Sequence, residues 1–272
     1  MFRIFYETST VEGMSEVRMN TPRGITLSGT FVQPVDSRDA AVLFSHSFLA
    51  DQHSGGHYDQ LARAYRKAGY ATLQFDYSGH GRSDDEVITR ESQIEDLQAA
   101  SGWLADQGFT HQIIHGHSFG SVTALAAHLI HATALFLSAP VLGPLSYDWS
   151  AIFSNSQLDE LEHTGQTRIP DDSDGPREFF TISKQTLADL SMVDSSIIDP
   201  KGAPAFILHD ADDIDLGLVD LTRDAFHRLP DGSRVEMVHD TRFGAGEHPE
   251  ILLEAALEWA HLWAEPSGEF RQ

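Results

Sequence analysis

The sequence contains no cysteine, few basic residues and no long apolar run, and each absence excludes a class of protein. Without cysteine, the chain can form neither a disulfide framework nor a thiolate metal site. Its 18 Lys and Arg stand against 41 Asp and Glu, and a net charge of −23 excludes nucleic acid and anionic membranes as expected partners. No apolar run approaches the roughly 18 residues of a membrane span, and residues 1–13 lack the apolar core of a secretory signal. We therefore expect a soluble, cytoplasmic protein.

What is present is typical of one large α/β domain. The chain has 272 residues, of which 41% are hydrophobic and 22% charged, enough for a full core. Short apolar runs alternate with longer helical patterns, which predicts a parallel sheet with helices on both faces. The predicted strands are 40–44, 71–75, 112–115, 134–137, 205–208 and 235–238, and the predicted helices are 57–68, 91–106, 119–131, 218–228 and 249–263. Two further segments, 15–19 and 25–32, flank a Pro-Arg-Gly turn and predict an antiparallel hairpin at the sheet edge.

One stretch, residues 141–202, interrupts this alternation. It shows no clear strand, holds a loop rich in Asp, Pro and Gly at 170–176, and has helical patterns near 151–161 and 177–190. A long insertion late in such a sheet is usually functional. We predict a small helical cap over residues 141–202, placed over the carboxyl ends of the strands of a core formed by 1–140 and 203–272.

The strongest chemical signal is Gly116-His117-Ser118-Phe119-Gly120, a G-x-S-x-G motif. It follows an apolar strand and opens a helix, as a nucleophile elbow requires. The serine of such an elbow sits in a strained turn, where side chains in place of the glycines would clash. Ser118 is therefore the predicted nucleophile.

A serine hydroxyl needs an adjacent base, and the base is oriented in turn by a carboxylate. His248 lies in the loop between the last predicted strand and the last helix, whereas its rival His239 falls at a strand end. The acid is expected just after the strand 205–208, where Asp213 is favoured and Asp212 is the alternative. The order Ser, Asp, His is that of a known hydrolase arrangement.

The oxyanion of an acyl-transfer reaction needs two backbone N–H donors. One is expected from Phe119, directly after the nucleophile. The other is expected from the loop after the strand 40–44, where we assign it to Phe48. Aromatic residues of the predicted cap are candidates for a substrate pocket or for the cap's own packing: Tyr147, Trp149, Phe153, Phe179 and Phe180.

With these motifs in place, the chain resembles the α/β-hydrolases over roughly residues 17–263, and most of all the bacterial cinnamoyl and feruloyl esterases and the serine aminopeptidase-like hydrolases. The resemblance rests on five motifs in the family's order: His46–Phe48, Asp76–Ser83, Gly116–Gly120, His209–Asp213 and Glu247-His248. It implies an eight-stranded, mostly parallel sheet, Asp213 as the acid, and Phe48 and Phe119 as oxyanion donors. It gives the Asp76–Ser83 loop a structural role.

Two positions depart from the family pattern. Ser47 and Asp210 stand where the family has glycine after histidine. Because glycine permits positive φ and close backbone approach, these two loops are where a different shape is expected.

Metal and cofactor signals are weak. His53 and His57 have helical ligand spacing but no third ligand nearby. Asp172–Gly175 resembles a calcium loop, but the first and twelfth ligand positions would fall on Pro170 and Thr181. No dinucleotide fingerprint follows the first strand. We expect no metal and no cofactor.

Together these features predict a serine hydrolase that cleaves small-molecule carboxylic esters, with aryl or hydroxycinnamoyl esters as candidates, through an acyl-enzyme. The same triad would also serve an amidase or peptidase, a thioesterase or a hydrolase of carbon–carbon bonds. A non-catalytic receptor that only binds a ligand is the alternative of a different class.

Overall fold

The computed structural model describes residues 13–173, 175–239 and 249–264. An eight-stranded sheet runs through its centre, in the order β1-β2-β4-β3-β5-β6-β9-β10. Its strands are β1 (Met14–Asn20), β2 (Thr26–Val32), β3 (Ala41–Ser45), β4 (Ala71–Phe75), β5 (Gln112–His117), β6 (Ala132–Ser138), β9 (Ala205–Asp210) and β10 (Arg234–Val238). The predicted eight-stranded α/β fold is confirmed.

The strands β3, β4, β5, β6, β9 and β10 run parallel to one another, and β1 and β2 form the antiparallel hairpin expected at the sheet edge. Every residue of β3 and β4 is buried. Near-continuous apolar runs of this kind are typical of strands covered on both faces. The sequence pattern therefore located the central strands to within about two residues.

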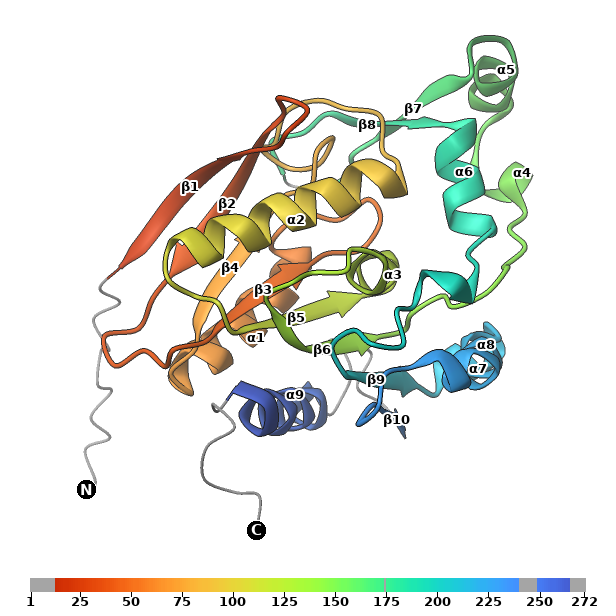
Figure 1. Cartoon of the computed structure of the whole chain (residues 1–272). Coiled ribbons are helices and arrows are strands. Elements are labelled where there is room, and N and C mark those ends of the chain that lie inside the picture. The colour runs from red at the N-terminus through yellow and green to blue at the C-terminus, as the bar shows by residue number, and fades with distance from the viewer. Residues whose placement is uncertain (1–12, 174, 240–248, 265–272) are drawn as a thin grey trace, which may run out of the picture.

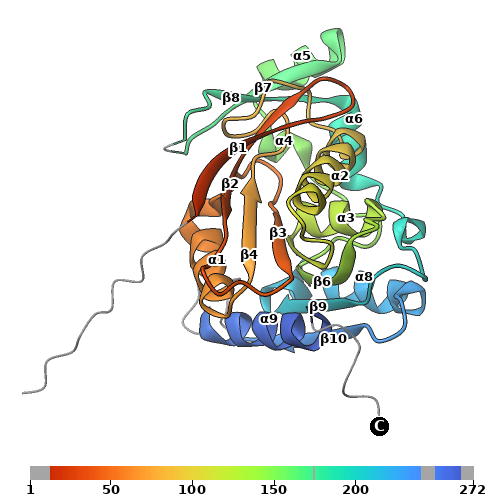
Figure 2. The same ribbon diagram turned by 60° about the vertical axis from the view of Figure 1, so that its left-hand side comes forward.

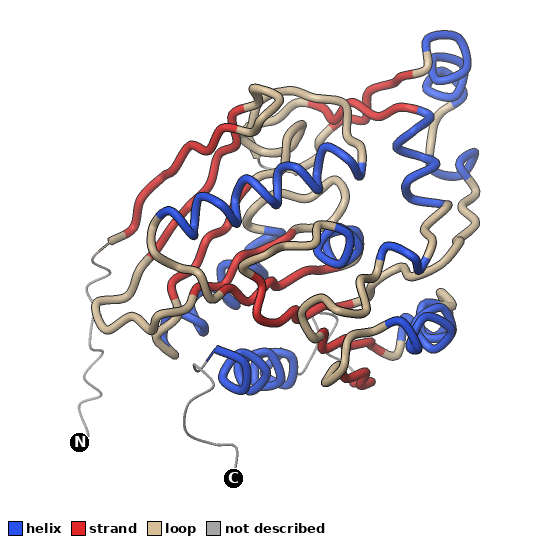
Figure 3. The backbone as a smooth tube through the Cα atoms, in the orientation of Figure 1, coloured by secondary structure: helices blue, strands red, loops and turns tan. Residues whose placement is uncertain are grey.

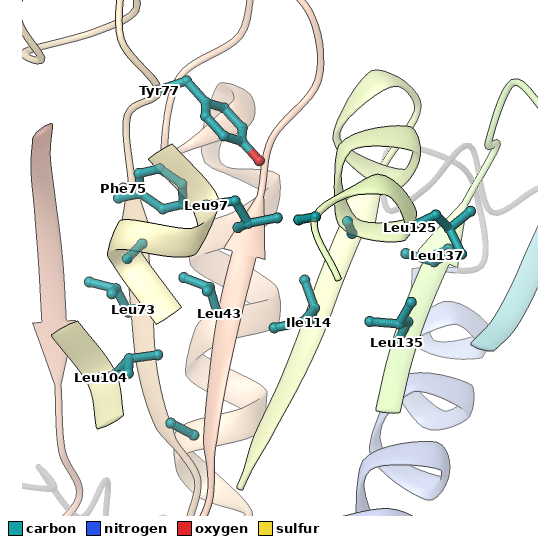
Figure 4. Close-up of a cluster of buried hydrophobic side chains, with 14 of the residues drawn as sticks. Leu43, Leu73, Phe75, Tyr77, Leu97, Leu104, Ile114, Leu125, Leu135 and Leu137 are labelled. Carbon is teal, nitrogen blue, oxygen red and sulfur yellow. The ribbon is translucent and has the colours of Figure 1, made fainter. Parts of the chain in front are cut away.

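Helices cover both faces of the sheet, as Figures 1 and 2 show. The helices are α1 (His57–Lys67), α2 (Arg90–Asp106), α3 (Phe119–Ala126), α7 (Asp212–Asp215), α8 (Leu218–Ala225) and α9 (Pro249–Ala264), with single turns at η1 (Ser54–Gly56) and η3 (Phe226–Arg228). One face packs against α2, α3 and α8, and the other against α1 and α9. Figure 4 shows leucine side chains of α2, α3 and the central strands meeting on the first face.

The segment between β6 and β9 lies at one end of the sheet, at the upper right of Figure 1. It consists of α4 (Trp149–Ile152), α5 (Asn155–Thr164), β7 (Gln166–Pro170), β8 (Phe179–Ser183), α6 (Lys184–Ser191) and η2 (Ser195–Ile197). The expectation that this segment holds no strand was wrong, because β7 and β8 pair as an antiparallel hairpin, drawn as two red segments in Figure 3. Each strand has only five residues, and although burial alternates along both, the residue types do not: Thr167 is buried, whereas Phe179 lies on the more exposed face, so the sequence shows too little pattern to detect.

Two helix boundaries also differ from the prediction. The third core helix ends at Ala126 rather than near 131, because His128 takes a left-handed backbone conformation and β6 begins at Ala132. The predicted helix from 177 begins only at Lys184, where the Ser183 side chain caps it by accepting a hydrogen bond from Thr186 N.

Within the described ranges, no helix is long and apolar enough to cross a membrane.

Candidate active site

Ser118 occupies a sharp turn between a buried strand and a helix. It is the residue between β5 and α3, and its backbone has φ 51° and ψ −117°, a conformation that a side chain makes costly. Its N–H donates to Ser138 O at 2.8 Å, which ties the turn to the neighbouring strand β6. Surrounding contacts maintain this strained backbone conformation. The turn places the half-buried Ser118 at the carboxyl end of the sheet.

The two glycines of the motif are required by close backbone contacts. A Cβ on Gly120 would lie 2.1 Å from Ser45 O and 2.5 Å from His46 O, and a Cβ on Gly116 would lie 2.9 Å from Ser121 Cα. Ser45 also donates its hydroxyl to Gly120 O at 2.8 Å. The end of β3 and the start of α3 therefore pack backbone against backbone beside the serine.

His117 precedes the serine and stays neutral near pH 7. Its Nδ1 lies 2.9 Å from Ser138 Oγ. Burial lowers the pKa of His117 to about 4, although the nearby Asp213 carboxylate acts in the opposite direction. A neutral imidazole leaves no fixed positive charge beside Ser118.

In the loop after β3, the carbonyl of Ser47 points toward the buried ring of His46. His46 is 1% exposed, accepts a hydrogen bond from Tyr77 N at 3.1 Å and donates from Nδ1 to Ser47 O at 2.9 Å. Burial lowers the pKa of His46, so the ring is neutral and has one donor and one acceptor nitrogen. Because carbonyl and N–H point in opposite directions across a trans peptide, the N–H of Phe48 points away from this ring.

The second predicted oxyanion donor, Phe119, is the first residue of α3. The first N–H groups of a helix have no acceptor within that helix and carry its positive dipole end. Phe48 and Phe119 are also neighbours through their side chains, whose rings are 6.2 Å apart. The structure thus brings together the two residues that were assigned to the oxyanion.

The predicted acid, Asp213, lies in α7 after β9 and is buried, whereas its alternative, Asp212, is exposed. Asp213 Oδ2 accepts from His209 Nδ1 at 2.8 Å and from Asp210 N at 3.1 Å. The described residues provide no hydrogen-bond donor to its second oxygen, Oδ1. His209 is buried and held on its other side by Thr222 Oγ1, at 2.8 Å from Nε2.

Sequence reasoning missed this role of His209, although its spacing of four residues from Asp213 was a signal for it. Asp210 is a second carboxylate that is only 3% exposed, and its Oδ1 accepts from Ala211 N at 2.6 Å. The predicted base, His248, lies outside the described residues. Its rival His239 is exposed at the end of β10.

A cavity of about 490 Å³ opens beside the serine and has largely apolar walls. Its lining includes Ser118, Phe119, Phe48, Tyr147, Trp149 and Phe153. The last three rings form a stack, with centroids 4.9 Å apart for Tyr147–Trp149 and 5.7 Å apart for Trp149–Phe153. Three of the five predicted pocket aromatics therefore line the cavity next to Ser118.

The other two predicted pocket aromatics do not line this cavity, and of the two Phe180 lines the second cavity described below. Phe180 is 3% exposed and packs in a small core with Ile88 and Ile182. Phe179 lies under the guanidinium of Arg168, 4.0 Å from the ring centroid. Both belong to β8, whose side chains hold the hairpin against the core.

A second, more polar cavity of about 800 Å³ lies on the other side of the Ser47–Leu49 loop. Its floor is Asp76, which accepts from Gln52 N at 2.8 Å and from Arg82 N at 3.0 Å. This carboxylate joins two loops, which gives the Asp76–Ser83 segment the structural role implied by the resemblance. The described residues contain no group of three or more His, Asp or Glu side chains that could hold a metal.

Comparison with solved structures identifies this architecture. The α/β-hydrolase GrgF from Penicillium sp. sh18 is 19% identical, with a TM-score of 0.72 over 92% of this chain and 99% of that chain. The chain has the α/β-hydrolase fold. A second solved structure is similar: the esterase domain of a Rhodothermus marinus protein is 21% identical, with a TM-score of 0.65 over 93% of this chain and 99% of that chain.

The resemblance drawn from the sequence is also confirmed. A family model described as serine aminopeptidase, S33, matches residues 36–167 of this chain, a range that includes Ser118. The esterase Est1E from Butyrivibrio proteoclasticus, solved with ferulic acid, is 18% identical, with a TM-score of 0.65 over 91% of this chain and 98% of that chain. A search of the curated proteins finds no match to this chain.

Proposed function

We propose that this protein is a serine hydrolase that cleaves carboxylic esters. The observation that carries the proposal is Ser118 in a strained turn, opening into a cavity whose walls are mostly apolar. Backbone strain at a non-glycine residue persists only where the surrounding structure enforces it, and such sites are commonly functional. A receptor that only binds a ligand gains nothing from this strain.

In the proposed reaction, Ser118 Oγ attacks the ester carbonyl carbon and its proton passes to His248. The carbonyl electron pair moves onto oxygen, where the N–H groups of Phe48 and Phe119 stabilise it. The pair then returns to reform the carbonyl, and the alcohol leaves with the proton from His248. Water attacks the resulting acyl-enzyme by the same route and releases the carboxylic acid.

The role proposed for Asp213 is to orient His248 and stabilise its imidazolium. Asp213 is suited to this because one oxygen is already held by His209 and by the backbone, which fixes the carboxylate plane. Its burial also keeps water from competing for the remaining oxygen. The exposed Asp212 has neither property.

The stacked rings of the cavity favour an acyl group with an aromatic or flat apolar part. Tyr147, Trp149 and Phe153 supply a large rigid surface, and aromatic pairs add about 0.5–1.5 kcal/mol each beyond burial of area. The similar Est1E was solved with ferulic acid, which is an aromatic acid. Aryl and hydroxycinnamoyl esters are therefore the proposed substrate class.

The test is hydrolysis of p-nitrophenyl acetate, butyrate and octanoate, and of methyl ferulate, by wild type and Ser118→Ala. We expect turnover by the wild type and a loss of about 10⁴-fold or more in the variant. Labelling by a fluorophosphonate, lost in the same variant, identifies the nucleophile independently. An active Ser118→Ala protein would overturn the proposal, and labelling without ester turnover would move the chemistry to another acyl bond such as an amide or thioester.

A further inference from the structure

Ser47 stands beside the nucleophile although it is far from it in sequence. The strands β3 and β5 are parallel neighbours, and Ser45 pairs with Gly116. Two residues beyond this pair on each strand come Ser47 and Ser118. Neighbouring strands are about 4.8 Å apart, and the backbone of Ser45 and His46 packs directly on Gly120. Ser47 and Ser118 also line the same cavity.

The hydroxyl of Ser47 differs from those of the serines around it. Ser45 Oγ donates to Gly120 O, Ser121 Oγ to Ser138 O, and Ser138 Oγ to Gly116 O. Each of these hydroxyls thus serves the packing of the elbow. The described residues offer no partner to Ser47 Oγ, and its side chain lines both the apolar and the polar cavity. Among the described residues nothing occupies this hydroxyl, so it is available to a group bound in either cavity.

The backbone of Ser47 is fixed from behind, which gives its side chain a defined position. Ser47 O accepts from His46 Nδ1 at 2.9 Å and from Ala50 N at 3.3 Å. The same anchoring sets the direction of the adjacent Phe48 N–H. Since Ser47 comes immediately before that N–H, its hydroxyl and the proposed oxyanion donor lie on the same short turn.

We infer that the Ser47 hydroxyl is a third hydrogen-bond donor to the oxyanion, beside the N–H groups of Phe48 and Phe119. The inference rests on the proposed function. When Ser118 Oγ bonds to the carbonyl carbon, negative charge develops on the carbonyl oxygen, and Ser47 O–H donates a hydrogen bond to it without transferring its proton. A donor of this kind acts mainly in the transition state and therefore raises kcat.

The experiment removes the hydroxyl in two ways, by Ser47→Ala and by Ser47→Gly. We measure kcat and KM on p-nitrophenyl butyrate, and the inhibition constant of a trifluoromethyl ketone, which forms a charged tetrahedral adduct with a serine nucleophile. Both variants should lower kcat by about 10- to 100-fold with KM within about twofold, and weaken inhibition by a similar factor. Ser196→Ala is the matched control, because Ser196 is exposed and is not among the residues that line either cavity, and it should match the wild type.

Two results would overturn the inference. One is a wild-type kcat in Ser47→Gly, which would show that the hydroxyl is not needed. The other is a reduced kcat with unchanged inhibition by the ketone, which would assign the loss to substrate positioning instead. Ser118→Ala separates this inference from the proposed function: if that variant is inactive while both Ser47 variants keep full activity, only the third donor is refuted.

Discussion

The turn at Ser118, the proposed nucleophile elbow, and the segment between β6 and β9, the proposed cap, are built by different kinds of interaction. At the elbow, backbone packs on backbone, and the space for a Cβ at Gly120 is only 2.1 Å from Ser45 O. In the cap, aromatic side chains pack on one another, and Trp149 and Phe153 face the cavity while they contribute to the cap's own core. Substitution is therefore expected to affect folding at the elbow and substrate choice in the cap.

The cap is nevertheless attached firmly on one side. Arg177, whose side chain is 8% exposed, pairs with Asp85 and donates to Ser83 O at 2.7 Å, in the loop after β4. The backbone of Ile88 donates to Thr181 O at 3.0 Å, so the hairpin β7–β8 is hydrogen-bonded to the same loop. The difference between the two regions can thus be tested at the elbow, at this attachment and at the aromatic stack.

The largest effect is expected for Gly120→Ala. Its new methyl group has no room beside two carbonyl oxygens of the neighbouring strand, so we expect a loss of about 3 kcal/mol or more in the free energy of unfolding. Urea unfolding measures this. Gly102→Ala in the middle of α2 is the control: a Cβ there meets nothing, and the change should stabilise the protein by roughly 1 kcal/mol. Equal effects in the two variants would contradict the steric account.

The next effect is expected for Arg177→Ala, which removes the buried attachment of the cap. The change leaves the Ser83 carbonyl without this donor and should cost about 2 kcal/mol. Amide hydrogen exchange of β8 should then speed up more than that of β3. Lys184→Ala removes an exposed ion pair with Glu162 and should cost less than about 0.5 kcal/mol. An unchanged exchange rate in β8 would show that the attachment does not hold the hairpin.

Acid should destabilise the protein through buried and half-buried histidines, among them His57 at the start of α1. Burial lowers the pKa of His57 to about 4 in the folded protein, whereas a histidine in the unfolded chain has a pKa near 6.5. Between these two pH values the unfolded state binds more protons than the folded state. The contribution of His57 to the free energy of unfolding is therefore fully present above about pH 6.5 and is lost as the pH falls toward 4. Because the ring is half-buried, we expect a loss of about 2 kcal/mol rather than the full linkage value.

The measurement for this prediction is the free energy of unfolding at several pH values. His57→Gln should flatten its slope between pH 6.5 and 4. His163→Gln, which changes an exposed histidine of the cap, should leave the slope as in the wild type. Identical slopes for wild type and His57→Gln would place the acid sensitivity elsewhere.

The smallest effect is expected for Trp149→Ala, the central ring of the stack. KM for methyl ferulate should rise about fivefold, or about 1 kcal/mol, while KM for p-nitrophenyl acetate changes less than twofold. Steady-state kinetics measure both. Phe226→Ala is the control, because that ring is 52% exposed in η3, away from the cavity. A parallel rise for both esters would mean that the stack only supports the fold of the cap.

Sequence pattern found most of the core and little of the cap, for a physical reason. The strands β3 and β4 are buried at every residue, and buried parallel strands leave an apolar run that is easily seen. The strands β7 and β8 are short, and their residues are partly exposed and partly paired with each other. Each strand of such a hairpin is stabilised by the other strand and by the residues packed beneath it, so the sequence of either strand alone carries a weak signal.

The candidate site divides in the same way. Ser118 and the glycines around it were predictable because a strained turn admits few residue types, and this restriction is visible in the sequence. The pocket aromatics were predictable as a class only. Trp149 in α4 faces the cavity and Phe180 in β8 packs in a small core, and these orientations depend on how α4 and β8 pack against the rest of the chain.

By itself, the sequence determined the α/β architecture, the elbow at Ser118 and the order of its motifs, because local periodicity and turn chemistry are written in consecutive residues. Only the tertiary structure decided that Asp213 is buried against His209 while Asp212 is exposed, and that Ser47 lies across from Ser118. Those relations join residues of different elements, and they arise from strand register and packing.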